Sequence, residues 1–138
     1  MTTAPCPDRP VAAPDPADAN EPRLTAYFAA ILERFHAIDT ARSTHRHLAL
    51  GGSHVALTFA TPSLEPHFWP ALAHLAAPAN EPTLRILLWD EHDTGVTMPR
   101  PDWPFDRFIV RGQVRGLSSP SVVSALDPNY NGFVVYDR

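Results

Sequence analysis

The segment LRILLWDEHDTGV, residues 84–96, begins with an apolar run and ends in a cluster of acids and a glycine. Its first six residues are apolar except for Arg85. A block this short and this apolar has the usual length of a strand that is covered on both faces. We therefore predict a buried central strand that emerges into a polar turn, with flanking segments that supply neighbouring strands and a covering layer.

The composition limits the classes of function. The chain has 138 residues, of which 44% are hydrophobic, and this predicts one domain with one core. Its 11 basic and 15 acidic residues leave a net charge of -4, so no surface for nucleic acid is predicted. All 11 basic residues are arginine. A chain without lysine has no P-loop lysine, no Schiff-base lysine and no lysine general base.

The single cysteine, Cys6, lies near the N-terminus. One cysteine allows no intrachain disulfide and no cage of thiolate ligands. Residues 1–21 are rich in proline, alanine and aspartate, and we predict a disordered tail that is neither a secretory signal nor a membrane anchor. No apolar run approaches the roughly 20 residues that a membrane-spanning helix needs. We expect a soluble, cytoplasmic protein with a single domain over residues 22–138.

A first helix is predicted from Pro22 onward, because apolar residues recur at steps of three and four. Pro22 suits the first turn of a helix, and the helix should fade near residues 42–44. We expect its apolar face to pack on the domain's own sheet. That face comprises Leu24, Tyr27, Phe28, Ile31, Leu32, Phe35 and Ile38.

A second helix is predicted within residues 61–77, where apolar residues again have helical spacing. Pro66 and Pro70 restrict where a regular helix can begin, because proline in a helix interior loses a hydrogen bond and clashes with the preceding turn. We expect the regular part to begin near Trp69 and to end before Pro78.

Two hairpins are predicted from alternating segments that flank turn residues. Residues 47–50 and 54–60 lie on either side of Gly51-Gly52, and the second segment alternates between larger and smaller side chains. Residues 122–126 and 133–136 flank a turn that contains proline, asparagine and glycine. Both pairs are therefore expected to be antiparallel.

The region between the acidic turn and the last hairpin supplies a loop and a further strand. Residues 99–104 hold three prolines, which predicts an extended loop. Residues 107–116 alternate, with one mostly cationic face, and predict a strand. Taken together, these elements predict an α+β domain with a mainly antiparallel sheet of five to seven strands and two helices packed on one face.

Seven histidines raise the question of a metal site. They have no zinc-site spacing, the sequence HExxH is absent, and no pair of cysteines is present. We therefore expect no metal site and no cofactor, with histidines that are exposed or hydrogen-bonded.

The triplet Asp93-Thr94-Gly95 matches the active triplet of aspartic proteases. That family places two apolar residues directly before the aspartate, whereas Glu91 and His92 stand there in this chain. The alternative is an ordinary polar turn, in which Asp93 accepts backbone hydrogen bonds and Gly95 adopts a positive φ.

The candidate binding residues are Asp90, Asp93, Arg111 and Arg115. The two acids belong to the turn after the predicted central strand, and the two arginines share one face of the predicted strand 107–116. The arginines would meet either a phosphate or those acids, and an internal ion pair is the first expectation. No complete catalytic motif is present, so no catalytic residue is assigned.

Four short motifs, taken together in their order along the chain, resemble a known family. Together they resemble the N-terminal region of bacterial HPr kinase-related proteins, which are P-loop serine kinase-like. The similarity covers roughly residues 46 to 138 and leaves out the tail and the first helix. The motifs are RHLALGG at 46–52, WPALAHL at 69–75, ILLWD at 86–90 with TGVTMP at 94–99, and RGQVRG at 111–116.

In those longer proteins such a region precedes a P-loop domain, which this chain lacks. The resemblance therefore implies a non-catalytic accessory or regulatory domain, or a fragment of a longer kinase-like protein, that acts through protein–protein contacts. Its partner would be a P-loop kinase-like protein in trans. The alternative is a small ligand-binding protein or hydrolase with a site around Asp90, Asp93 and Arg111. A pocket where these side chains converge would favour the alternative, and an exposed apolar patch would favour the accessory domain.

Overall fold

The computed structural model describes residues 21–103, 109–110, 113–114, 116–127 and 132–137, and all structural statements concern these residues. The chain divides into two compact units. The central unit consists of residues 29–101, and the terminal unit consists of the chain before and after them. A single domain over residues 22–138 stays a prediction, and the predicted disordered tail lies outside the described residues, apart from Glu21.

Helix α1, Glu21–His36, is the amphipathic helix that the apolar spacing predicts. It contributes its residues up to Phe28 to the terminal unit and those from Ala29 onward to the central unit. The helix ends earlier than expected. The chain continues into a short 3-10 turn, η2 (Thr40–Arg42). Asp39 caps this turn, because its carboxylate accepts a hydrogen bond from the Ala41 N–H.

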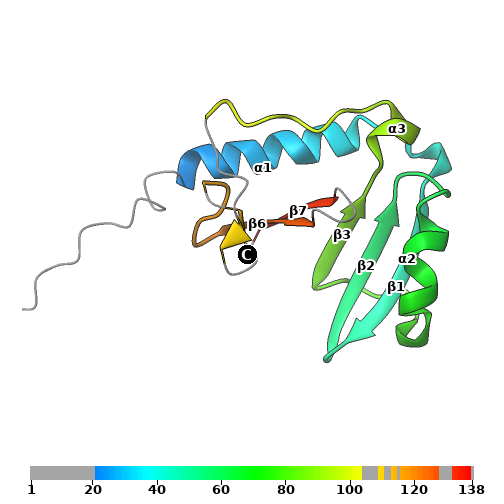
Figure 1. Ribbon diagram of the computed structural model, residues 1–138. Helices are drawn as coiled ribbons and strands as arrows, with labels where there is room; N and C mark the ends of the chain where they lie inside the picture. The colour runs from blue at the N-terminus through cyan, green and yellow to red at the C-terminus, as the bar shows by residue number, and fades with distance from the viewer. Residues whose placement is uncertain (1–20, 104–108, 111–112, 115, 128–131, 138) are drawn as a thin grey trace, which may run out of the picture. The chain divides into compact units, whose positions relative to one another are not determined.

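A mixed three-stranded sheet forms the framework of the central unit (Figure 1). Strand β2, Ser53–Phe59, lies between β1, Thr44–Leu50, and β3, Leu84–Leu88. It pairs antiparallel with β1 and parallel with β3. Gly51 and Gly52 have φ values of 57° and 84°, the left-handed conformation that a tight two-residue hairpin requires. The predicted first hairpin is therefore confirmed.

The prediction that residues 84–89 form the central strand of the sheet is wrong, although side chains of this segment do pack into the apolar clusters on both faces. The strand itself is present, but β3 is the edge strand of the three-stranded sheet. The side chain of Ile86 is 37% exposed, whereas Phe59 in β2 is fully buried. The apolar run predicts that this segment is a strand, but it does not predict the position of that strand in the sheet. The central position belongs to β2, which pairs with a strand along each of its two edges.

Helix α2, Glu65–Leu72, begins four residues before the predicted start at Trp69. Pro66 lies in its first turn, where a backbone N–H would have no helical partner, so proline removes nothing there. Pro70 lies inside the helix and cannot donate to the carbonyl four residues earlier. The α-helix ends two residues later and continues as a 3-10 turn, η3 (Ala73–Leu75).

The two helices that pack on this sheet lie on opposite faces rather than on one face. Side chains alternate between the faces of a strand, so Phe59 and Ala60 point in opposite directions, as do Leu88 and Leu87. The face toward α2 and η3 comprises Leu48, Val55, Leu57 and Phe59 with Leu64, Trp69, Leu72, Leu75, Leu84 and Leu88. The face toward the end of α1 comprises Phe35, Ile38 and Ala60 with Leu87, Trp89 and Val96.

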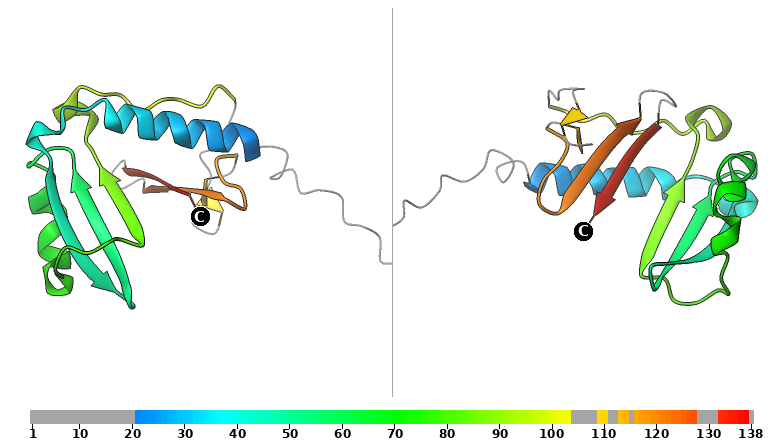
Figure 2. Two further views of the ribbon diagram at one scale, coloured as in Figure 1. Left: turned by 180° about the vertical axis from the view of Figure 1, so that it is seen from behind. Right: turned by 60° about the horizontal axis from the view of Figure 1, so that its bottom comes forward.

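In the terminal unit, β6, Val122–Asp127, and β7, Gly132–Asp137, form the antiparallel hairpin that the sequence predicts (Figure 2). The predicted strand 107–116 is wrong as a single strand. Its described residues form two short strands, β4 (Ile109–Val110) and β5 (Gln113–Val114), which pair antiparallel with each other. The buried side chains of this unit include Leu24, Tyr27, Val114, Leu117, Val122 and Ser124.

The α+β class is confirmed. The strand arrangement differs from the expected single sheet, because the described strands form one mixed three-stranded sheet and two separate antiparallel pairs. Of the helices that the structure describes, none has the length and apolar character needed to cross a membrane.

Candidate functional site

The acidic turn after β3 folds into a one-turn helix, α3, Glu91–Thr94. Asp90 caps it, because one carboxylate oxygen accepts hydrogen bonds from the backbone N–H groups of His92 at 2.8 Å and Asp93 at 3.0 Å. Gly95 ends the helix with a φ of 67°, and its N–H donates to the carbonyl of Glu91. The predicted positive φ at Gly95 is confirmed, but the acid that accepts backbone hydrogen bonds is Asp90 rather than Asp93.

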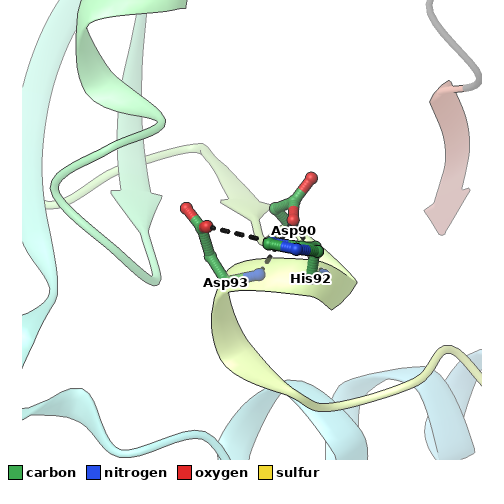
Figure 3. Close-up of side chains that lie close together, drawn as sticks. All are labelled: Asp90, His92 and Asp93. Carbon is green, nitrogen blue, oxygen red and sulfur yellow. Dashed lines mark hydrogen bonds and ion pairs between the residues drawn. The ribbon is translucent and has the colours of Figure 1, made fainter.

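Asp93 connects α3 to the segment between β2 and α2. Its carboxylate accepts a hydrogen bond from the Ser63 hydroxyl, which lies 2.7 Å from the hydroxyl of Thr61. The ring of His92 faces the other carboxylate oxygen, with 3.7 Å between the two atoms (Figure 3). The Ser63 hydroxyl, followed by His92, holds the pKa of Asp93 below its usual value. These contacts hold α3 in place.

Asp90, His92 and Asp93 each place one potential metal-ligand atom within 4.8 Å of the others. All three residues are exposed, and both carboxylates already accept hydrogen bonds from their own surroundings. In this cluster the carboxylate of Asp93 lies between the Ser63 hydroxyl and the His92 ring. In a nucleophilic triad the imidazole lies between the hydroxyl and the carboxylate, so the arrangement here is different. A carboxylate with a lowered pKa is also a weaker general base. The cluster is thus explained by its role in local structure.

Arg111 and Arg115, the other two candidate binding residues, lie outside the described residues. Asp90 and Asp93 lie together, exposed, in the central unit, and neither is among the residues that line the groove described below. The convergence of Asp90, Asp93 and Arg111 therefore stays a prediction.

A second polar cluster joins β1 to α2. The guanidinium of Arg46 donates to the carboxylate of Glu65 at 2.7 Å and lies over the ring of Trp69, 5.4 Å from its centroid. The hydroxyl of Thr44, and then the Arg46 guanidinium, lower the pKa of Glu65. Because Glu65 is the first residue of α2, this contact fixes the start of the helix against the sheet.

The segment after α3 borders a groove of about 620 Å³ in the central unit. Three hydrogen bonds fix this segment. The Trp89 indole N–H donates to the Val96 carbonyl at 3.1 Å, and the Met98 N–H donates to the Glu91 carboxylate at 2.7 Å. The Val96 N–H donates to the Thr94 hydroxyl at 3.2 Å. The groove is lined by Arg34, Ala37, Gly95, Val96, Thr97, Met98, Pro99 and Arg100.

The two arginines of this groove were not among the residues singled out from the sequence. Arg34 lies near the end of α1, and Arg100 lies in the proline-rich segment 66 positions later. No motif connects residues so far apart. The local signal is Arg100 itself, a charged residue between Pro99 and Pro101, because a residue that precedes proline is disfavoured in helical backbone.

No protein-family model matches the chain, and neither a curated protein nor a solved structure matches it. The resemblance to HPr kinase-related proteins therefore stays a prediction.

Proposed function

We propose that this protein is a non-catalytic accessory module that acts in the cytoplasm through protein–protein contacts. Its partner is a P-loop kinase-like protein in trans, as the resemblance to HPr kinase-related proteins implies. The observation that carries the proposal is the outer edge of β3. In the part of the chain that the structure describes, no strand pairs with that edge.

The geometry of β3 supports this use of the edge. The Leu88 carbonyl accepts a hydrogen bond from the Ala60 N–H, so the backbone groups of Leu88 point toward β2. Backbone groups alternate along a strand, so those of Ile86 also point toward β2, and those of Arg85 and Leu87 point outward. Unpaired N–H and C=O groups at a strand edge are a template for another chain.

An exposed apolar side chain lies along the same strand. Ile86 is exposed on the face that carries α2, and Phe68 of that helix is also exposed. A partner strand at the β3 edge would cover Ile86 and add burial to the backbone hydrogen bonds. One oxygen of Asp90 caps α3 and one oxygen of Asp93 accepts a hydrogen bond from Ser63, and these structural contacts favour the accessory module over the alternative site.

The test is affinity capture of the tagged full chain from its native host, with mass spectrometry of the recovered proteins. We expect near-stoichiometric recovery of a P-loop kinase-like protein. The Ile86→Asp variant should lose it, because a charge would be buried at the contact. Leu50→Asp, which alters an exposed apolar residue on β1, is the matched control and should retain the partner.

Circular dichroism shows whether both variants fold. Recovery of the partner by folded Ile86→Asp would exclude the β3 edge as the contact. Nucleotide turnover by the purified wild-type protein alone, or the absence of any specifically recovered protein, would overturn the proposed function.

A further inference from the structure

We infer that the groove between the end of α1 and residues 95–100 binds an acidic peptide segment in an extended conformation. The inference rests on the proposed function, because it names the chemistry of a partner segment. The groove lies entirely within the central unit and is separate from the β3 edge. Its volume, about 620 Å³, is in the range of binding sites for a short segment of a few side chains.

The charge of the groove selects an anion. Arg34 and Arg100 both line it and are both exposed. In the described part of the chain, neither guanidinium has an ion-pair or hydrogen-bond partner, whereas Arg46 and Arg85 are each paired with a glutamate. The groove-lining residues include no acid. Two unpaired guanidinium groups beside one groove are suited to carboxylates, which they bind through charge-assisted hydrogen bonds.

The backbone of Thr97 selects a peptide rather than a free anion. The Val96 carbonyl and the Met98 N–H are both bonded toward the domain, to Trp89 and Glu91. A trans peptide unit directs its N–H and C=O in opposite directions, so the N–H and C=O of Thr97 both point away from those bonds. A donor and an acceptor on one residue, both directed away from the bonds that hold the segment, match the backbone of a second, extended chain.

The remaining lining residues favour apolar side chains between the carboxylates. Ala37, Val96, Met98 and Pro99 contribute apolar surface. Side chains of an extended peptide alternate between two sides. A segment that alternates acidic and apolar residues therefore presents carboxylates on one side and apolar side chains on the other. The three hydrogen bonds that fix residues 96–98 keep the groove formed before binding, which lowers the entropy lost on association.

The test uses the full chain and a fluorescein-labelled peptide of sequence Glu-Leu-Glu-Leu-Glu, with binding measured by fluorescence anisotropy. The same peptide with glutamine at each glutamate position is the matched control. We expect the acidic peptide to bind more tightly than the glutamine peptide, and its binding to weaken as salt is added. Arg34→Ala and Arg100→Ala should each weaken binding by about three- to tenfold. Arg42→Ala, at an exposed arginine outside the groove, should leave it unchanged.

The backbone contact is tested at Thr97. Thr97→Pro removes the N–H donor and should weaken binding, while Thr97→Val keeps the donor and should not. Equal binding of the two peptides, or binding that is insensitive to Arg34→Ala and Arg100→Ala, would overturn the inference. A dimer of the wild-type chain that the same two substitutions dissociate would also overturn it, because a second copy would then occupy the groove.

The outcome is separable from that of the proposed function. If the double variant Arg34→Ala/Arg100→Ala still captures the kinase-like partner and no longer discriminates the peptides, the β3 edge is the main contact and the groove is an additional one. If partner capture fails in the wild type while the acidic peptide still binds in the groove, the accessory function is wrong and the peptide site stands.

Discussion

Strands β2 and β3 are neighbours in one sheet, and they differ in a way that their sequences do not suggest. The apolar run 84–89 is the more continuous of the two, whereas residues 54–60 alternate with histidine, alanine and threonine. Yet β2 occupies the middle of the sheet and β3 its edge. Continuous hydrophobicity in a strand is therefore a poor guide to its place in a sheet.

The difference has a physical explanation. The larger side chains of β2 point to one face and are buried in the cluster that includes α2 and η3, while its other face carries the small Ala56, and Ala60 follows the strand. Connectivity adds to this, because the two-glycine turn joins β2 to β1 and leaves only one side of β2 for β3. The apolar residues of β3 serve two faces, with Leu88 in the cluster under α2 and Leu87 in the cluster with Phe35.

The largest expected effect contrasts the two strands directly. Phe59→Ala should lower the free energy of unfolding by about 3–5 kcal/mol, because it empties a fully buried site. Ile86→Ala should lower it by about 1 kcal/mol, because the side chain is already partly in water. Urea denaturation followed by circular dichroism measures both. Equal losses in the two variants would mean that β3 is covered as well as β2.

A smaller effect tests the direction of the backbone groups in β3. Ile86→Pro removes an N–H that points toward β2 and should destabilise the protein by about 3 kcal/mol. Arg85→Pro removes an N–H that points outward, at a position where proline is tolerated, and should cost about 1 kcal/mol. The same denaturation experiment measures both. The reverse order of stabilities would show that the alternation assigned to β3 is wrong.

The smallest effect concerns the ion pairs at the two edges of the sheet. Glu65→Gln, on the β1 side, should cost about 0.5–1 kcal/mol near neutral pH because the contact with Arg46 is only partly exposed. The pKa of Glu65 is lowered in the folded state, so its contribution is present above the unfolded pKa and is lost as the pH falls through the folded pKa. The stability difference between wild type and variant should therefore shrink toward zero in acid.

Glu81→Gln is the matched control on the β3 side. Glu81 pairs with Arg85 at 3.1 Å, but both side chains are mostly exposed. Solvent screens such a pair, so the substitution should change stability by less than about 0.3 kcal/mol at any pH. A pH-dependent loss for Glu81→Gln as large as that for Glu65→Gln would remove the distinction between the two edges.

Much of the local structure was predictable because it depends on neighbouring residues. The glycine pair sets the first hairpin, and the three- and four-residue spacing of apolar residues sets α1. The sequence does not predict the start of α2, because a proline either interrupts a helix or occupies its first turn, and Pro66 occupies the first turn. The turn at residues 90–95 was predicted, but the choice of Asp90 over Asp93 as the cap depends on where the helix begins.

The candidate site was predicted only in part. Asp90 and Asp93 do lie together, because four positions on one short turn are neighbours in any fold. The groove with Arg34 and Arg100 was not foreseen, because its two arginines are joined by packing and not by spacing.

The sequence by itself determined α1, the two hairpins and the presence of a strand at Leu84–Leu88, since periodicity and turn residues act over a few positions. Only the tertiary structure decided that β2 is central, that the end of α1 and α2 cover opposite faces, and that Arg34 and Arg100 border one groove. The physical reason is that burial is shared among distant segments. A strand or a side chain is covered only when another part of the chain packs against it, and no local pattern specifies which part that is.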